Sequence, residues 1–150
     1  MKSLFDPQTQ REVLERLDSL TDSSIPLWGR MKVGQMVHHC QMPLEVALGN
    51  PQRLKVPNPL VRLLMKGYKK NLYNDRPWKR NMPTAPGFKV TEDKDFIREK
   101  SKLIQLLNDF HLLREKGELE PHPIFGTFTK QQWGQMQYKH LDHHLRQFGV

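Results

Sequence analysis

The sequence has one cysteine, Cys40, and no long apolar run among its 150 residues. A single thiol cannot form an internal disulfide, so a disulfide-stapled secreted domain is excluded. No apolar stretch approaches the roughly 20 residues that span a bilayer, and residues 1–13 lack the apolar core of a signal peptide. We therefore expect one domain, residues 1–150, in the cytoplasm and without a membrane contact.

The chain also lacks strand-like alternation of apolar and polar residues, and it has no internal repeat. Apolar residues recur instead at helical spacing, and Asp6, Thr91 and Thr129 stand where helix caps are expected. Helices are expected at residues 7–21, 31–49, 59–73, 91–117 and 130–148. We predict an all-α fold: a four-helix bundle with a short extra helix in a crossover formed by residues 50–90.

Acidic residues are scarce in one segment of the chain. Residues 53–89 contain ten of the 24 basic residues and one of the 16 acidic residues, Asp75. The rest of the chain has 14 basic and 15 acidic residues, a net charge of −1. Three interpretations stay open: a solvated surface, attraction of an anionic small-molecule substrate or cofactor, and nucleic-acid binding, which we favour least.

The stretch HLDHHLRQF, residues 140–148, is rich in histidine. A helical projection places four polar residues on one solvated face: Gln135, Lys139, Asp142 and Arg146. His140 and His144 fall one turn apart in the opposite, apolar arc, with Gln137 beside them and His143 at the edge. Imidazoles at i and i+4 can direct nitrogens at one metal ion. The alternative is a pair of buried histidines hydrogen-bonded to neighbours.

A third imidazole is available in the helix expected at 31–49. His38 and His39 point about 100° apart on this helix. His38 aligns with a polar wedge formed by Gly34, Gln41 and Glu45, whereas His39 lies on a largely apolar surface. We therefore expect His39 to face the histidine pair. Pro43 cannot donate to the carbonyl of His39, so a kink or local opening is expected there, either to shape a site or for packing alone.

Three neutral imidazoles from two helices suit Zn²⁺ or Ni²⁺. Such a site leaves coordination positions open for water, an anionic ligand or a thiolate, and metal-bound water becomes acidic enough to react near neutral pH. An open site favours chemistry over a purely structural role.

The residues around these histidines resemble the DinB/YfiT-like superfamily of metal-binding four-helix bundles. Its pattern is a histidine in the second helix and H-x-x-H-H-x-x-Q in the last, and this chain has HLDHHLRQ at residues 140–147. More closely, WGRMKVGQMVHHC and HPIFGTFTKQQWGQMQYKHLDHHLRQFG resemble an uncharacterised DinB-like family marked by HPxFG and YKHxDHHxxQFG. The resemblance covers nearly the whole chain.

The resemblance implies an up-down-down-up bundle, frequently a homodimer, with a divalent metal on His39, His140 and His144. Characterised relatives are S-transferases that use bacillithiol or mycothiol, and a maleylpyruvate isomerase that uses a thiol. We expect a metal-dependent hydrolase or thiol S-transferase acting on a small molecule, with a low-molecular-weight thiol as a candidate cofactor. The alternative is a non-catalytic metal- or ligand-binding bundle.

Three further residues are candidates to support the metal ligands or to contact substrate: His122, Gln137 and His143. His122 begins the stretch HPIFG, which precedes the last helix. The interpretation that we favour for HPIFG is structural, a shaped turn with Phe125 closing one end of the bundle. Trp133 and Met136 are likewise expected in the core.

Overall fold

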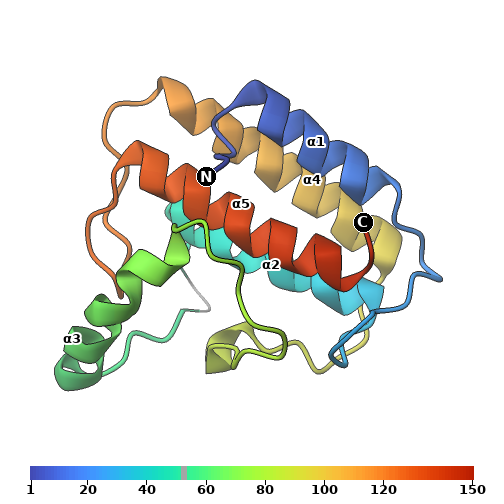
Figure 1. Ribbon diagram of the computed structural model, residues 1–150, viewed down its shortest axis with the longest axis horizontal. Coiled ribbons are helices and arrows are strands. Elements are labelled where there is room, and N and C mark those ends of the chain that lie inside the picture. The colour runs from blue at the N-terminus through green and yellow to red at the C-terminus, as the bar shows by residue number, and fades with distance from the viewer. Residues whose placement is uncertain (52–53) are drawn as a thin grey trace.

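The computed structural model describes residues 1–51 and 54–150, and every regular element in these ranges is helical (Figure 1). The α-helices are α1 (Pro7–Asp18), α2 (Val33–Ala47), α3 (Pro59–Tyr68), α4 (Phe96–Leu112) and α5 (Lys130–Gln147). Short 3₁₀ helices are η1 (Lys69–Leu72), η2 (Pro86–Phe88) and η3 (Leu113–Glu115). The predicted all-α class is confirmed. Among the described helices, none has the length and apolar character to cross a membrane.

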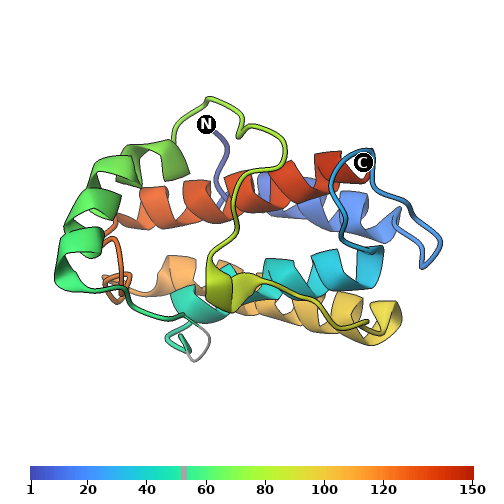
Figure 2. The same ribbon diagram turned by 90° about the horizontal axis from the view of Figure 1, so that it is seen from below.

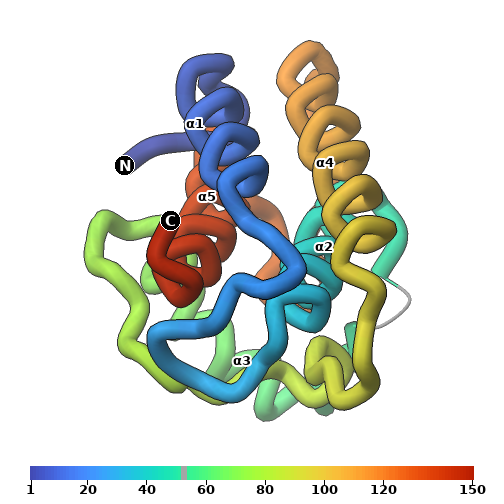
Figure 3. The backbone as a smooth tube through the Cα atoms, turned by 90° about the vertical axis from the view of Figure 1, so that its right-hand side faces the viewer, coloured from blue at the N-terminus to red at the C-terminus, as the bar shows by residue number. Residues whose placement is uncertain are grey.

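The four long helices lie side by side (Figure 3). α2 packs against α4 and α5, and α1 packs against the same two helices. α1 and α5 run in one direction, and α2 and α4 run in the other (Figure 1). The core between them contains large side chains that are almost fully buried, namely Leu17, Met36, Leu44, Leu103, Phe110, Trp133, Leu141 and Leu145. Each such side chain contributes roughly 1.5–3 kcal/mol by leaving water.

Two of the predicted helix caps are confirmed. The Asp6 carboxylate accepts a hydrogen bond from the main-chain nitrogen of Gln8 at 3.1 Å, at the start of α1. Thr129 and Gln132 form a reciprocal capping box at the start of α5, with hydrogen bonds of 3.2 and 2.9 Å. These local bonds satisfy main-chain N–H groups that have no partner within the helix.

The predicted start of α4 at Thr91 is wrong. The helix begins at residue 96, and Asp95 caps it by accepting from the main-chain nitrogen of Arg98 at 2.8 Å. The segment before it is held by α2, because Gln35 Nε2 donates to the main-chain oxygens of Thr91 at 3.4 Å and Glu92 at 3.2 Å. A contact with another helix therefore outweighs the local capping signal.

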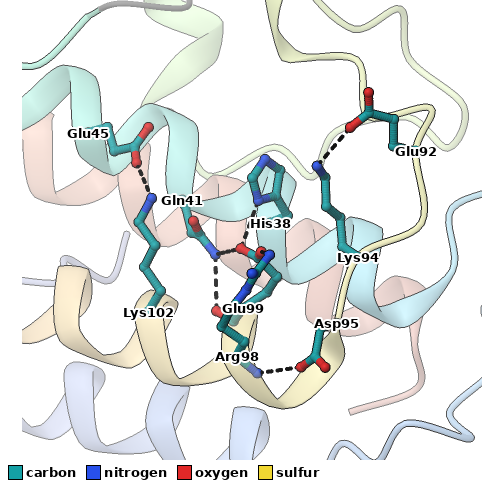
Figure 4. A network of polar contacts seen from close by, with 9 residues as sticks. All are labelled: His38, Gln41, Glu45, Glu92, Lys94, Asp95, Arg98, Glu99 and Lys102. Atoms are coloured by element: carbon teal, nitrogen blue, oxygen red, sulfur yellow. Dashed lines mark hydrogen bonds and ion pairs between the residues drawn. The ribbon is translucent and has the colours of Figure 1, made fainter.

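The polar wedge of α2 forms its contact with α4 (Figure 4). His38 Nδ1 lies 2.7 Å from Glu99 Oε2, and Gln41 Nε2 donates to Glu99 Oε2 at 2.8 Å. Burial alone would raise the pKa of the Glu99 carboxyl, but hydrogen bonds from His38, Gln41 and Arg98 lower it to about 2. The ionised carboxylate thus joins α4 to α2 through buried, charge-assisted hydrogen bonds.

Residues 73–90 are the last part of the crossover expected at residues 50–90 and are named the crossover segment. They pass from α5 to α2 (Figure 2). Lys139, on α5, holds the chain at two points: Asn71, just before this segment, and Asn74, within it. Its Nζ donates to the main-chain oxygens of Asn71 at 2.8 Å and Asn74 at 3.0 Å, and to Asn74 Oδ1 at 2.6 Å. The solvated position predicted for Lys139 is therefore wrong: the side chain is buried because three oxygen atoms satisfy its ammonium group.

Gly34 lies where α2 passes the chain leading into α4. A Cβ at this position would stand 2.2 Å from the main-chain oxygen of Lys94.

We predict that Gly34→Ala lowers the free energy of unfolding by about 1–3 kcal/mol, since the main chain must shift. Gly67→Ala in α3 is the matched control, because its Cβ would meet nothing within 4 Å. Urea unfolding followed by circular dichroism compares them, and equal effects would contradict the close approach.

Candidate metal centre

Three histidines from two antiparallel helices converge between α2 and α5. His39, His140 and His144 each offer one nitrogen, and these nitrogens all lie within 4.8 Å of one another. All three side chains are buried. In the ranges that the structure describes, no other group of three or more histidine, cysteine or acidic residues has this arrangement. These are the residues that the sequence pattern indicates, and together they can hold a metal ion.

A main-chain carbonyl orients His39. Its Nδ1 lies 2.9 Å from the oxygen of Phe88, in the crossover segment. A carbonyl oxygen can only accept, so Nδ1 carries the proton and the lone pair is on Nε2. His39 Nε2 lies 3.0 Å from His140 Nε2. The neutral ring therefore presents its Nε2 lone pair to the other two rings.

Gln147 orients His144 in the same way. Gln147 Nε2 donates to the main-chain oxygen of Trp28 at 2.7 Å, which fixes the amide with its oxygen toward His144. His144 Nδ1 donates to this oxygen at 2.9 Å, so the lone pair is again on Nε2. This is the arrangement typical of metal-binding histidines, whose second nitrogen is held by an outer hydrogen-bond acceptor.

The three rings are neutral. Burial lowers the pKa of His39, places that of His140 well below its ordinary value, and lowers that of His144 to about 3. Neighbouring histidines add to the effect, because two adjacent imidazolium ions repel. Metal ions bind the neutral imidazole, so the site does not have to release protons before binding near neutral pH.

The donor set fits a divalent metal ion. Two nitrogens on one tetrahedral zinc ion lie about 3.3 Å apart, given zinc–nitrogen bonds of about 2.0–2.1 Å. The two Nε2 atoms of His39 and His140, 3.0 Å apart, come close to this spacing, whereas the donor separations within the triad reach 4.8 Å. His140 Nδ1 is buried without a hydrogen-bond partner, so the ring is held by packing, including the Trp78 ring at 5.9 Å. Cys40 does not join the donors, since its Sγ contacts Met36 Sδ and burial raises the pKa of its thiol.

Gln137 links the two helices that carry the triad. Its Nε2 donates to the main-chain oxygen of Pro43 at 2.8 Å, and its Oε1 is buried without a partner. α2 continues through Pro43 as one helix to Ala47. Gln137 thus fixes α5 against α2 one turn before His140.

His143 and His122 have different surroundings. The half-buried His143 ring lies against His144, with ring centres 5.1 Å apart, and also contacts Trp28 and Trp78. His122 instead packs on Trp133, two turns before His140 on α5. Its Nδ1 accepts hydrogen bonds from the main-chain nitrogens of Ile124 at 3.1 Å and Phe125 at 3.3 Å. The structure therefore places His143 beside the triad and gives His122 a turn-forming role.

Three contributors to the site are not apparent from the sequence: Phe88, Trp78 and Gln147. Phe88 acts through its main-chain oxygen, which no side-chain pattern reveals. Trp78 lies in a segment without helical periodicity, so no pattern places it near the triad. Gln147 carried a usable signal, because it ends the motif HLDHHLRQ at i+3 from His144.

Gln147→Met should weaken divalent-metal binding by about 10–100-fold, because it removes the acceptor that orients His144 while keeping the side chain's length. Gln135→Met, on the same helix, is the control, since Gln135 reaches only the main-chain oxygen of Met1. Competition with a chelator of known zinc affinity measures both. Equal affinities in the two variants would show that Gln147 does not support the site.

His122 should make the protein sensitive to acid. Burial, then the nearby charge of Lys69, lowers the pKa of His122 to about 4. As the pH falls, the unfolded chain therefore binds a proton at this histidine before the folded protein does. The contribution of neutral His122 to stability is complete above pH 6.5 and is lost as the pH falls toward 4. In His122→Asn the amide oxygen can accept the same main-chain hydrogen bonds without titrating. Between pH 7 and pH 4, we predict that His122→Asn loses less unfolding free energy than the unaltered protein, by roughly 1–3 kcal/mol. Identical losses in urea unfolding would contradict this.

Comparison with known proteins gives one match. A family model described as a protein of unknown function (DUF1569) matches residues 4–149. No curated protein and no solved structure matches the chain. Because the family model spans nearly the whole sequence, with both helices that carry the triad, the chain belongs to the DUF1569 family.

Proposed function

We propose that the protein is a metal-dependent enzyme of the DinB/YfiT-like superfamily, with Zn²⁺ or Ni²⁺ on His39, His140 and His144. The observation that carries the proposal is the convergence of three buried, neutral imidazoles, two of which have Nδ1 held by an acceptor. The opposite directions of α1 and α5 against α2 and α4 support an up-down-down-up bundle (Figure 1). The proposed chemistry is hydrolysis or thiol-dependent transfer on a small molecule.

The residues of this chain bind and orient. The three histidines bind the ion, and the Phe88 carbonyl and the Gln147 amide hold two of their rings in place. The Trp78 ring lies against His140, with ring centres 5.9 Å apart. When bound, the metal supplies a Lewis acid that lowers the pKa of a coordinated water or thiol.

A second candidate is a non-catalytic metal- or ligand-binding bundle. The acidic groups near the site favour this second candidate, because each of them is held in a contact away from the triad. Glu99 is held in the contact between α2 and α4, and Asp142 accepts from Arg16 Nη1 at 2.9 Å. Neither is placed to take a proton at the triad, so neither can serve there as a general base.

Metal analysis tests the proposed ion site. Protein purified and dialysed against Zn²⁺ or Ni²⁺ should retain one ion per chain. His140→Gln and His144→Gln should lose more affinity than the about 10–100-fold expected for an outer partner. His122→Asn is the matched control, because it alters a buried histidine that packs on Trp133. No stoichiometric metal, or equal affinity in all variants, would refute the site.

Turnover separates the two candidate functions. The zinc- and nickel-loaded proteins are assayed for consumption of a low-molecular-weight thiol with 1-chloro-2,4-dinitrobenzene, and for hydrolysis of an activated ester. We expect one of these activities, lost in His144→Gln and kept in His122→Asn. Tight metal binding without turnover of either substrate class would favour the binding bundle.

A further inference from the structure

A pocket of about 350 Å³ lies over the C-terminal half of α5, between the loop that carries Trp28 and the crossover segment. Figure 2 shows these two segments beside α5. The volume is at the lower end of the range of about 300–1,000 Å³ found for small-molecule sites. This pocket is separate from the triad but adjoins it through His143.

Two indole rings face this pocket, with His143 between them. The ring centre of His143 lies 6.0 Å from that of Trp28 and 5.8 Å from that of Trp78, in edge-on contacts at 63° and 62°. The Trp78 ring also contacts His140, and the His143 ring contacts His144. A ligand in the pocket is therefore one side chain away from two of the three candidate metal ligands.

The side-chain charges that line the pocket favour an anion, because Arg80, Lys139 and Arg146 outnumber Asp142. The exposed Arg80 guanidinium stacks over Trp28 at 4.5 Å, and among the described residues no carboxylate pairs with it. Arg146 forms an ion pair with Asp142 Oδ2 at 3.7 Å, a distance too long for a strong hydrogen bond. Arg16, on α1, donates to Asp142 Oδ1 and to the main-chain oxygen of Val150, each at 2.9 Å. These two acceptors beside the pocket are therefore occupied. Arg80 and Arg146 thus keep donors for a ligand.

We infer that this pocket holds the non-reacting part of the substrate, and that this part is a small aromatic carboxylate. The flat ring packs on the pocket side of Trp28, His143 and Trp78, where aromatic contacts are favourable. The carboxylate meets Arg80 and Arg146, whose planar guanidinium groups match its geometry. The inference rests on the proposed function, since it assigns the substrate class of the same site.

Intrinsic fluorescence provides the test, because two of the three tryptophans line the pocket and Trp133 lies in the core. The protein, stripped of metal with EDTA and desalted, is titrated with benzoate and with benzamide, its neutral isostere. We expect benzoate to bind, and benzamide to bind at least about 10-fold more weakly. Equal binding of the two ligands, or no binding of benzoate, would overturn the inference.

Arginine variants locate the contact. Arg80→Met and Arg146→Met should each weaken benzoate binding by about 10–100-fold. Arg76→Met, in the same crossover segment but outside the pocket lining, should leave it unchanged. Thermal midpoints verify that all variants are folded. Unaltered benzoate binding in both Arg80→Met and Arg146→Met would overturn the assignment.

Omitting the metal separates this inference from the proposed function. If metal-stripped protein discriminates benzoate from benzamide but never binds Zn²⁺ or Ni²⁺, the pocket is supported and the metal proposal fails. If the metal binds at the triad while benzoate does not bind, the metal proposal survives and the pocket assignment fails.

Discussion

Three imidazoles buried between α2 and α5 impose the constraint on which the surrounding structure depends. Burial excludes their charged forms, so His39 and His144 each need an acceptor for one remaining proton. Those acceptors come from Phe88 and Gln147, and Gln147 in turn holds the main chain at Trp28. The crossover segment and the loop before α2 are thus both fastened to the same cluster. Two irregular segments gain fixed positions because a buried polar site has to be satisfied.

Two sides of α2 carry buried polar groups that contact neighbouring helices. One side faces α5 through His39, and the other faces α4 through His38 and Gln41. The two contacts differ in charge, since the α4 contact contains the Glu99 carboxylate while the three rings of the triad are neutral. Hydrogen bonds to the carboxylate are directional, so they fix α2 against α4 without placing a charge among the triad.

The sequence was sufficient for the presence of the helices and for the inward faces of the three histidines, because both depend on short-range periodicity. Asp6 and Thr129 cap their helices through neighbours in the chain, and His140 and His144 share a face whatever lies opposite. The features that the sequence could not reveal depend on contacts with residues far away in the chain. Thr91 loses its capping role to a contact with Gln35, and Lys139 is buried by oxygen atoms some 65 to 68 residues away in sequence. Main-chain acceptors such as Phe88 leave no trace in side-chain patterns.

His38 and His39 are neighbours in the chain, yet they serve different helices. Turning α2 by about 100° about its axis would carry His38 to the position of His39, but it would carry His39 to that of Cys40 and remove the imidazole from Glu99. The contacts of both histidines therefore fit the same single rotational setting of α2. Gly34 belongs to that setting, since a Cβ there would stand 2.2 Å from the carbonyl oxygen of Lys94. Two chemically identical neighbours are thus divided between a carboxylate and a candidate metal site.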